Sequence, residues 1–115
     1  SPIIELVDRY CIAKLKMHKT SLNLDEFNFY KDQLSKFDLG LVDREIDELY
    51  QIHAEIWALE SELKSGVEHK LTLEEIGRRA IQIRNWNNKR IAIKNTVATK
   101  LGSNIHEIKK DHLSQ

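Results

Sequence analysis

The chain has 115 residues with 18 basic and 18 acidic side chains, so its formal net charge at pH 7 is zero. This length fits one domain, and the hydrophobic share of 41% with a charged share of 31% is typical of a soluble protein rather than a disordered chain. The zero net charge argues against a nucleic-acid binder, which needs a basic excess to neutralise phosphates.

Two shorter helices are predicted in the N-terminal part. The first runs from the start of the chain to about Lys19, because apolar side chains at helical spacing cover about half of its circumference. The second ends near Phe37 and opens at Asn23, which forms a capping-box pattern with Glu26. Gly40 is expected to close this helix in the left-handed conformation.

Two long helices of opposite charge follow, over about 43–65 and 73–101. The first carries seven acids and two bases, and the second carries seven bases and two acids. The short connection predicts an antiparallel hairpin in which the two helices face each other with complementary charge. Thr72 and Glu75 form a second capping box, and Gly102 is expected to end the last helix. The predicted fold is therefore all-α, a four-helix arrangement dominated by this hairpin.

The domain boundary is expected near residue 103. Residues 1–103 form a single helical domain in this interpretation, and residues 104–115 form a polar C-terminal tail. The apolar stripe of the last helix is predicted to bury these residues: Ile76, Ile83, Trp86, Ile91, Ile93, Val97 and Leu101.

Polar side chains interrupt the apolar stripes of the helices. Because a buried charge needs a partner, these residues must be paired, reach outward to solvent, or line a wet cavity. The hairpin geometry predicts that Glu60 meets Arg79, that His53 lies near Asn87, and that Arg90 approaches Glu48 and Tyr50. The candidate cluster consists of Lys14, His53, Glu60, Arg79, Asn87, Arg90 and Lys94.

This cluster has three interpretations that the sequence leaves open. It can be a hydrogen-bonded core layer that sets the register of the helices. It can be a positively charged pocket that binds a small carboxylate or phosphate. Such a pocket could also be catalytic, as in helical chorismate mutases, where cationic side chains hold a dicarboxylate. It can also be part of a dimer seam.

Complete catalytic, cofactor and metal motifs are not found. The Glu-x-x-His pairs of di-iron bundles and the glycine-rich phosphate loops are absent, so we expect no cofactor and no metal.

Cys11 is the single cysteine and lies on an apolar helix face, which predicts a buried reduced thiol. With no apolar run of spanning length and no signal peptide, we expect a cytoplasmic protein without membrane contact.

Several short stretches carry a family resemblance. They are Leu-Tyr-Gln-Ile-His-Ala-Glu-Ile-Trp-Ala-Leu-Glu (49–60), Asn-Asn-Lys-Arg (87–90), Lys-Asn (94–95), Leu-Gly-Ser (101–103) and Glu-Leu-Val-Asp-Arg (5–9). In these stretches the chain resembles an uncharacterised family of short all-helical bacterial and phage proteins, a domain of unknown function often encoded near surface-polysaccharide genes. The resemblance implies a helical fold and no particular activity.

The function predicted from these observations is a non-enzymatic module for protein interaction or assembly. We expect a homodimer, with a further protein as a possible partner. The alternative is a small anionic metabolite bound, or transformed, in the bundle core by the cluster defined above.

Overall fold

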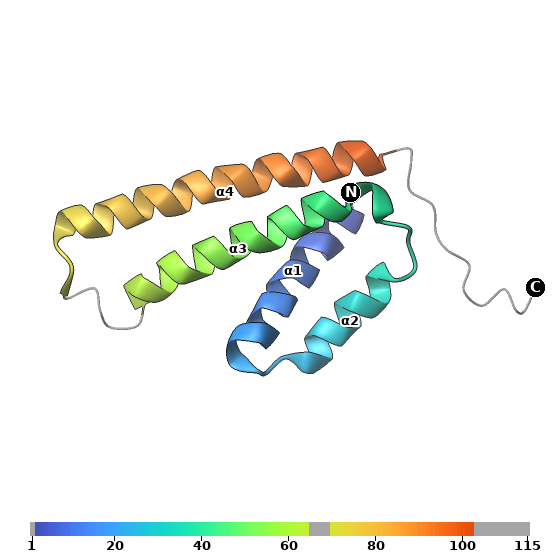
Figure 1. Cartoon of the computed structure of the whole chain (residues 1–115), viewed down its shortest axis with the longest axis horizontal. Coiled ribbons are helices and arrows are strands. Elements are labelled where there is room, and N and C mark those ends of the chain that lie inside the picture. The colour runs from blue at the N-terminus through green and yellow to red at the C-terminus, as the bar shows by residue number, and fades with distance from the viewer. Residues whose placement is uncertain (1, 65–69, 103–115) are drawn as a thin grey trace, which may run out of the picture.

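The fold is all-α with four helices, as the sequence predicts (Figure 1). The computed structural model describes residues 2–64 and 70–102, and contains no strand within them. A 3-10 turn, η1, precedes the third helix. The elements are α1 (Pro2–Thr20), α2 (Leu24–Leu34), η1 (Gly40–Val42), α3 (Asp43–Lys64) and α4 (Leu73–Leu101).

The helices α3 and α4 lie side by side and run in opposite directions (Figure 1). Two ion pairs define this orientation: Glu45 near the start of α3 contacts Lys100 near the end of α4, and Glu62 near the end of α3 contacts Arg79 near the start of α4. α1 packs obliquely against the first half of α3, and α2 packs against α1 (Figure 1). Part of the connection between α3 and α4, and the expected tail over 104–115, lie outside the described residues.

The start of α4 is capped as predicted, whereas the start of α2 is not. The Glu75 backbone N–H donates to the Thr72 hydroxyl and the Thr72 N–H donates to the Glu75 carboxylate, both at 3.1 Å. Asn23 instead has a left-handed backbone, φ 64°, and its side chain makes no capping hydrogen bond. Ser21, at φ 60°, is left-handed too. These two residues reverse the chain between α1 and α2, and this use of Asn23 excludes the extended conformation that a capping side chain needs.

The predicted end of α2 also needs correction, whereas α4 ends at Leu101 as predicted. α2 ends at Leu34, before the expected Phe37, because Ser35 turns its hydroxyl back onto the carbonyl oxygen of Asp32 at 2.6 Å. Gly40 begins a 3-10 turn and donates its N–H to the Asp38 carboxylate at 3.1 Å. Gly102 is right-handed at φ −34°. Gly40 is therefore not in the left-handed conformation that was expected, and Gly102 ends α4 with a right-handed backbone.

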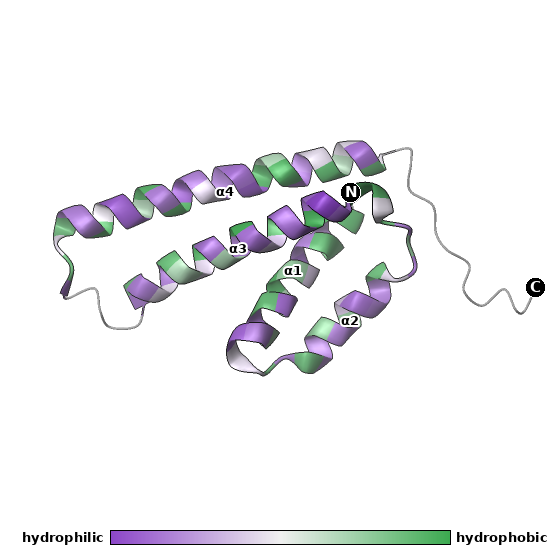
Figure 2. Cartoon of the chain, viewed as in Figure 1, coloured by the Kyte–Doolittle hydropathy of each residue, from purple (hydrophilic) through white to green (hydrophobic). Residues whose placement is uncertain are grey.

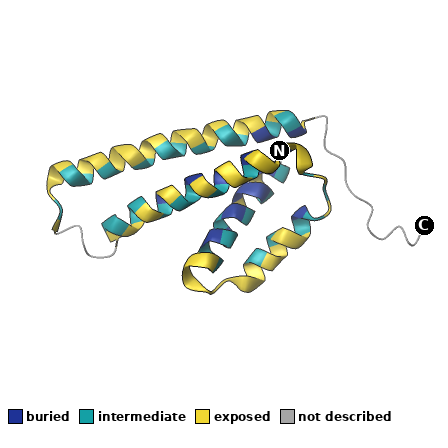
Figure 3. Cartoon of the chain, in the orientation of Figure 1, coloured by how far each residue is buried: buried dark blue, intermediate teal, exposed yellow. Residues whose placement is uncertain are grey.

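The core lies where α1 crosses the α3–α4 pair. Its fully buried side chains come from all three helices, and include Val7, Cys11, Leu49 and Val97. Figure 3 shows the buried positions gathered at this end of the molecule, while α4 from Leu73 to Thr96 has none. The far half of the α3–α4 pair is therefore a two-helix arm whose apolar residues are only half covered.

Only Val97 and Leu101 of the predicted α4 stripe are buried, while Ile91 is on the surface and the other four positions are half-buried. Ile91 is 51% exposed, and Figure 2 shows that apolar and polar positions alternate along the whole length of α4. Ile91 lines a shallow hollow with Ile4 and Lys94, because α1 covers only part of this side of α4. The prediction that Ile91 is buried was wrong for this reason.

Candidate functional site

Asp8 is the centre of a buried polar network between α1, α3 and α4. Its side chain is 9% exposed, and its Oδ1 lies 2.7 Å from Nε2 of His53 on α3. Its Oδ2 lies 3.4 Å from Nη1 of Arg90 on α4. Since a carboxylate can only accept, His53 donates from Nε2 and Arg90 donates from Nη1. One α1 side chain thus connects three helices.

Lys94, Glu5 and Asn87 extend this network toward solvent. The Lys94 Nζ lies 3.3 Å from the Glu5 carboxylate and 3.8 Å from that of Asp8. The Arg90 Nε donates to the Asn87 side-chain oxygen at 3.2 Å. The two cations of α4 therefore face two carboxylates of α1, and the network is balanced in charge. We call this set the Asp8 network: Glu5, Asp8, His53, Asn87, Arg90 and Lys94.

The pKa of Asp8 reflects both its burial and its partners. Burial raises the pKa, but the hydrogen bond from His53 and the electrostatic attraction of His53, Lys94 and Arg90 outweigh it. The pKa of Asp8 is therefore lowered from its usual value of 3.8. Asp8 is ionised at neutral pH, which lets it hold all three donors at once.

Four of the seven residues in the predicted cluster come together in this network, and three do not. The four are His53, Asn87, Arg90 and Lys94. Lys14 instead lies over the ring of Tyr50, 4.9 Å from the ring centroid, and Tyr50 also shares a 2.8 Å hydrogen bond between its hydroxyl and His18.

The other two lie farther along the arm. Arg79 binds Glu62 at 2.5 Å, and Glu60 lines a shallow hollow with Trp57, Ser61 and Lys64. The predicted pair Glu60–Arg79 is wrong, because residues two apart on a helix point about 200° apart. Glu62 is on the edge of α3 that reaches Arg79, and Glu60 is on the opposite edge.

The predicted partners of Arg90 are wrong because α1 supplies a carboxylate. Arg90 was expected near Glu48 and Tyr50, yet it binds Asp8 and Asn87. His53 binds Asp8, and it is connected to Asn87 through Asp8 and Arg90. The expectation treated α3 and α4 as an isolated pair. A third helix that places a carboxylate between them redirects both side chains.

Asp8 and Glu5 are the site residues that the sequence prediction missed. A weak signal for Asp8 was present: at 100° per residue it lies next to Leu15, at the edge of the apolar arc of α1. An acidic residue at the edge of an apolar arc is a weaker anomaly than Arg90 and Lys94, which lie inside the arc of α4. Glu5 is exposed and had no such signal.

The Asp8 network is better suited to holding helices together than to binding an anion. Arg90 and Lys94, the cations that would attract a carboxylate or phosphate, already face Asp8 and Glu5. A ligand would have to displace Asp8, whose buried charge would then lose its partners. The interpretation as an anion pocket stays a prediction.

Cys11 is completely buried beneath this network and donates weakly to the Ile46 carbonyl oxygen at 3.7 Å. Burial raises the pKa of its thiol to about 12. The thiolate is the nucleophilic form, so Cys11 is inert at neutral pH. This agrees with the prediction of a buried thiol.

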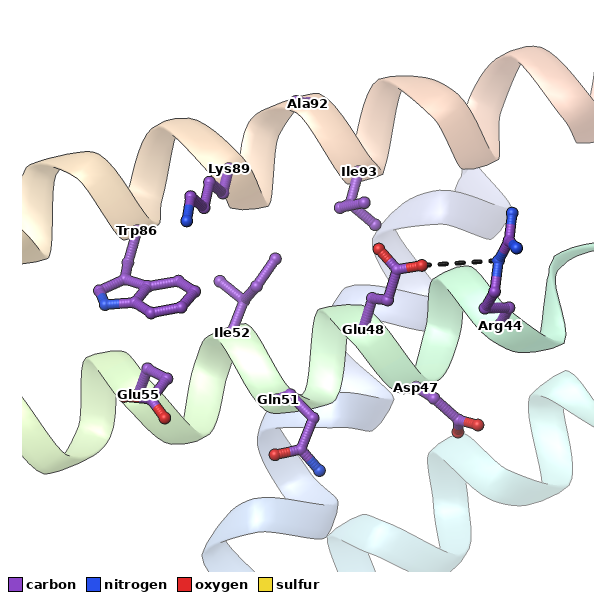
Figure 4. Close-up of a pocket in the computed structure, with 10 residues that line it drawn as sticks. All are labelled: Arg44, Asp47, Glu48, Gln51, Ile52, Glu55, Trp86, Lys89, Ala92 and Ile93. Carbon is purple, nitrogen blue, oxygen red and sulfur yellow. Dashed lines mark ion pairs between the residues drawn. The ribbon is translucent and has the colours of Figure 1, made fainter.

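A second feature is an open apolar groove on the other edge of the α3–α4 pair. It has a volume of about 540 Å³ and is lined by α3 and α4 alone. Figure 4 shows Trp86 and Ile52 facing each other across it, with Ile93 farther along α4. On both helices the groove residues and the partners of Asp8 lie at opposite edges of the apolar stripe. One edge is thus covered by α1 and the other is open.

The rim of the groove is divided by charge. The α3 rim carries Asp47, Glu48 and Glu55, and Arg44 at its end binds Glu48 at 3.6 Å (Figure 4). The α4 rim carries Lys89, whose Nζ lies 4.4 Å from the centroid of the Trp86 ring.

Over residues 2–64 and 70–102, no three His, Cys, Asp or Glu side chains are placed so that they could hold a metal ion. None of the helices in these two segments is long and apolar enough to cross a membrane. The chain matches no protein-family model, and searches of curated proteins and of solved structures found no similar protein.

Proposed function

We propose that this protein is a non-enzymatic helical module that assembles with a second copy of itself through the open groove of the α3–α4 pair. The observation that carries the proposal is the groove itself. Trp86, Ile52 and Ile93 form an apolar strip between two helices, and no other helix of the described chain lines it. An apolar strip between charged rims is the usual form of a helix-docking surface.

The size of this face supports an association between two chains. The α3 lining of the groove runs from Arg44 to Glu55, so the groove measures about 18 by 20 Å. That is on the order of 360 Å², enough for the central part of a standard interface, which buries roughly 800 Å² per partner. This edge of the α3–α4 pair gains from such a contact, because no third helix of the described chain lines it.

We propose a non-enzymatic role because the polar side chains best suited to catalysis contact one another. Asp8, His53, Arg90 and Lys94 form a balanced network on the α1 side, away from the groove. The groove floor is apolar and its rim charges are solvated. The alternative, a small anion in the bundle core, has less support because no cation of that network is left without a carboxylate.

The test is the mass of the purified protein by light scattering over a wide concentration range. We expect a mass twice the 13.5 kDa of one chain at the high end of the range. A mass of one chain throughout would refute the proposal.

A substitution that introduces no charge then tests whether the groove is the site of contact. Ala92 lines the groove, and Ala92→Gln adds bulk and polarity with little change in helix propensity. We expect it to weaken the dimer by about tenfold, which is about 1.4 kcal/mol. Ala80→Gln is the matched control, since Ala80 is also an exposed alanine of α4 but lies outside the groove. Equal effects of the two variants would place the contact elsewhere.

A further inference from the structure

The charges along the groove define how the second copy lies on it, and this inference rests on the proposed function. We infer that two copies dock face to face about a two-fold axis, with α3 of each chain over α4 of the other, so that four helices form one bundle. The partner is thus a second copy of this chain in one of two possible orientations. The charges of the two rims and the positions of these charges along the helices determine which orientation is favoured.

The first step is the distribution of charge. The whole of α3 carries seven acids and two bases, and α4 carries seven bases and two acids. On the α3 rim, Asp47 and Glu55 make no ion pair with any residue that the structure describes. On the α4 rim, Lys89 lies over the face of Trp86 and has no ion pair within the described segments. Each rim therefore has charge available for a partner.

The second step is the symmetry of a dimer. A two-fold contact uses the same surface on both copies. When the axis runs along the helices, each acidic rim meets a basic rim, and this favourable contact occurs twice. When the axis runs across them, α3 meets α3 and acids face acids. Charge complementarity between rims favours the first orientation and opposes the second.

The third step is the register, which identifies the residues that meet. Within a chain Ile52 faces Trp86 across the groove (Figure 4). The helices are antiparallel, so Lys89, three residues beyond Trp86, is level with Leu49, the neighbour of Glu48. An axis along the helices keeps these levels, and it places Lys89 of one copy beside Glu48 of the other. Both side chains line the groove and are exposed.

The experiment exchanges these two charges. Glu48→Lys and Lys89→Glu are made singly and together, and association is measured by sedimentation equilibrium. Each single variant brings like charges together twice, so we expect its homodimer to weaken by about tenfold. A mixture of the two single variants restores both contacts, and we expect a heterodimer close to wild-type strength.

The variant with both exchanges separates the two orientations. In the inferred orientation it forms homodimers of near wild-type strength, but it does not mix with the wild type, because Glu48 would then face Glu and Lys89 would face Lys. In the orientation with α3 over α3, the same variant mixes with the wild type preferentially. Preferential mixing, measured with one chain isotopically labelled in native mass spectrometry, overturns the inference.

Two controls complete the experiment. Asp43→Lys and Arg84→Glu make changes of the same sign at exposed positions outside the groove, and we expect no effect on the dimer. Circular dichroism of each variant checks that the monomer is folded, because Glu48→Lys also removes the ion pair with Arg44.

The outcomes distinguish the inference from the function on which it rests. A wild-type chain that stays monomeric, or that binds only a different protein, refutes the proposed function. A wild-type dimer that ignores the exchanges at Glu48 and Lys89 leaves that function standing and refutes this orientation. A dimer that grows stronger as salt is added also refutes it, because screening weakens contacts between opposite charges.

Discussion

Replacing Asp8 with asparagine tests whether the Asp8 network holds the three helices together. Asp8→Asn keeps the shape of the side chain and removes its charge. Asparagine can still accept the hydrogen bond of His53 through its oxygen. It cannot attract Arg90 and Lys94, and its amide group brings donors toward these cations.

The expected loss follows from the burial of the groups involved. A hydrogen bond to a charged group contributes about 1.5–3 kcal/mol, and breaking a buried ion pair costs about 3–5 kcal/mol. Arg90 and Lys94 have side chains that are 26% and 19% exposed, so water compensates in part. We therefore expect Asp8→Asn to reduce the free energy of unfolding by about 2–3 kcal/mol, or the melting temperature by about 10 °C.

The dependence on pH gives a second signature. The folded-state pKa of Asp8 is lowered from 3.8, so its contribution is present above pH 3.8 and is lost as the pH falls through the folded-state value. The difference in stability between wild type and Asp8→Asn should therefore be full at neutral pH and shrink in acid below pH 3.8. Urea unfolding of both proteins, followed by circular dichroism at neutral pH and at a pH below 3.8, measures this difference in stability.

The control is Glu5→Gln, which removes the other carboxylate near Lys94. Glu5 is 58% exposed, so its pair with Lys94 should contribute less than about 0.5 kcal/mol. If Asp8→Asn changes the free energy of unfolding by no more than Glu5→Gln does, the network does not hold the helices together and the reasoning is refuted.

Three further predictions concern the fold. Thr72→Ala removes the capping box of α4 and should lower the unfolding free energy by about 1 kcal/mol in urea titrations, whereas no change would mean that this end of α4 is already frayed. Leu49→Ala opens a cavity at a fully buried position and should cost about 3 kcal/mol, while Leu73→Ala, at 88% exposure, should stay within about 0.5 kcal/mol. Cys11, with its pKa raised to about 12, should react with a thiol reagent only as the protein unfolds, and rapid labelling of the native protein would contradict its burial.

The sequence by itself determined the number and type of the elements. The boundaries of the two long helices, Asp43–Lys64 and Leu73–Leu101, agree with the predicted 43–65 and 73–101. The reason is local: apolar periodicity and the Thr72 capping box act within a few residues of the chain. Local rules failed at Asn23, where the need to reverse the chain between α1 and α2 prevailed over the capping pattern.

The partners of the polar side chains were decided only by the tertiary structure. Spacing along α3 and α4 indicated correctly that His53, Arg90 and Lys94 are anomalous in an apolar stripe, but it paired them across the wrong helices. A sequence pattern gives the face on which a side chain lies; it does not give which third helix packs there or at what angle. The oblique packing of α1 brings Asp8 to His53, Arg90 and Lys94, and the same packing leaves the groove beside Trp86 open on the opposite edge.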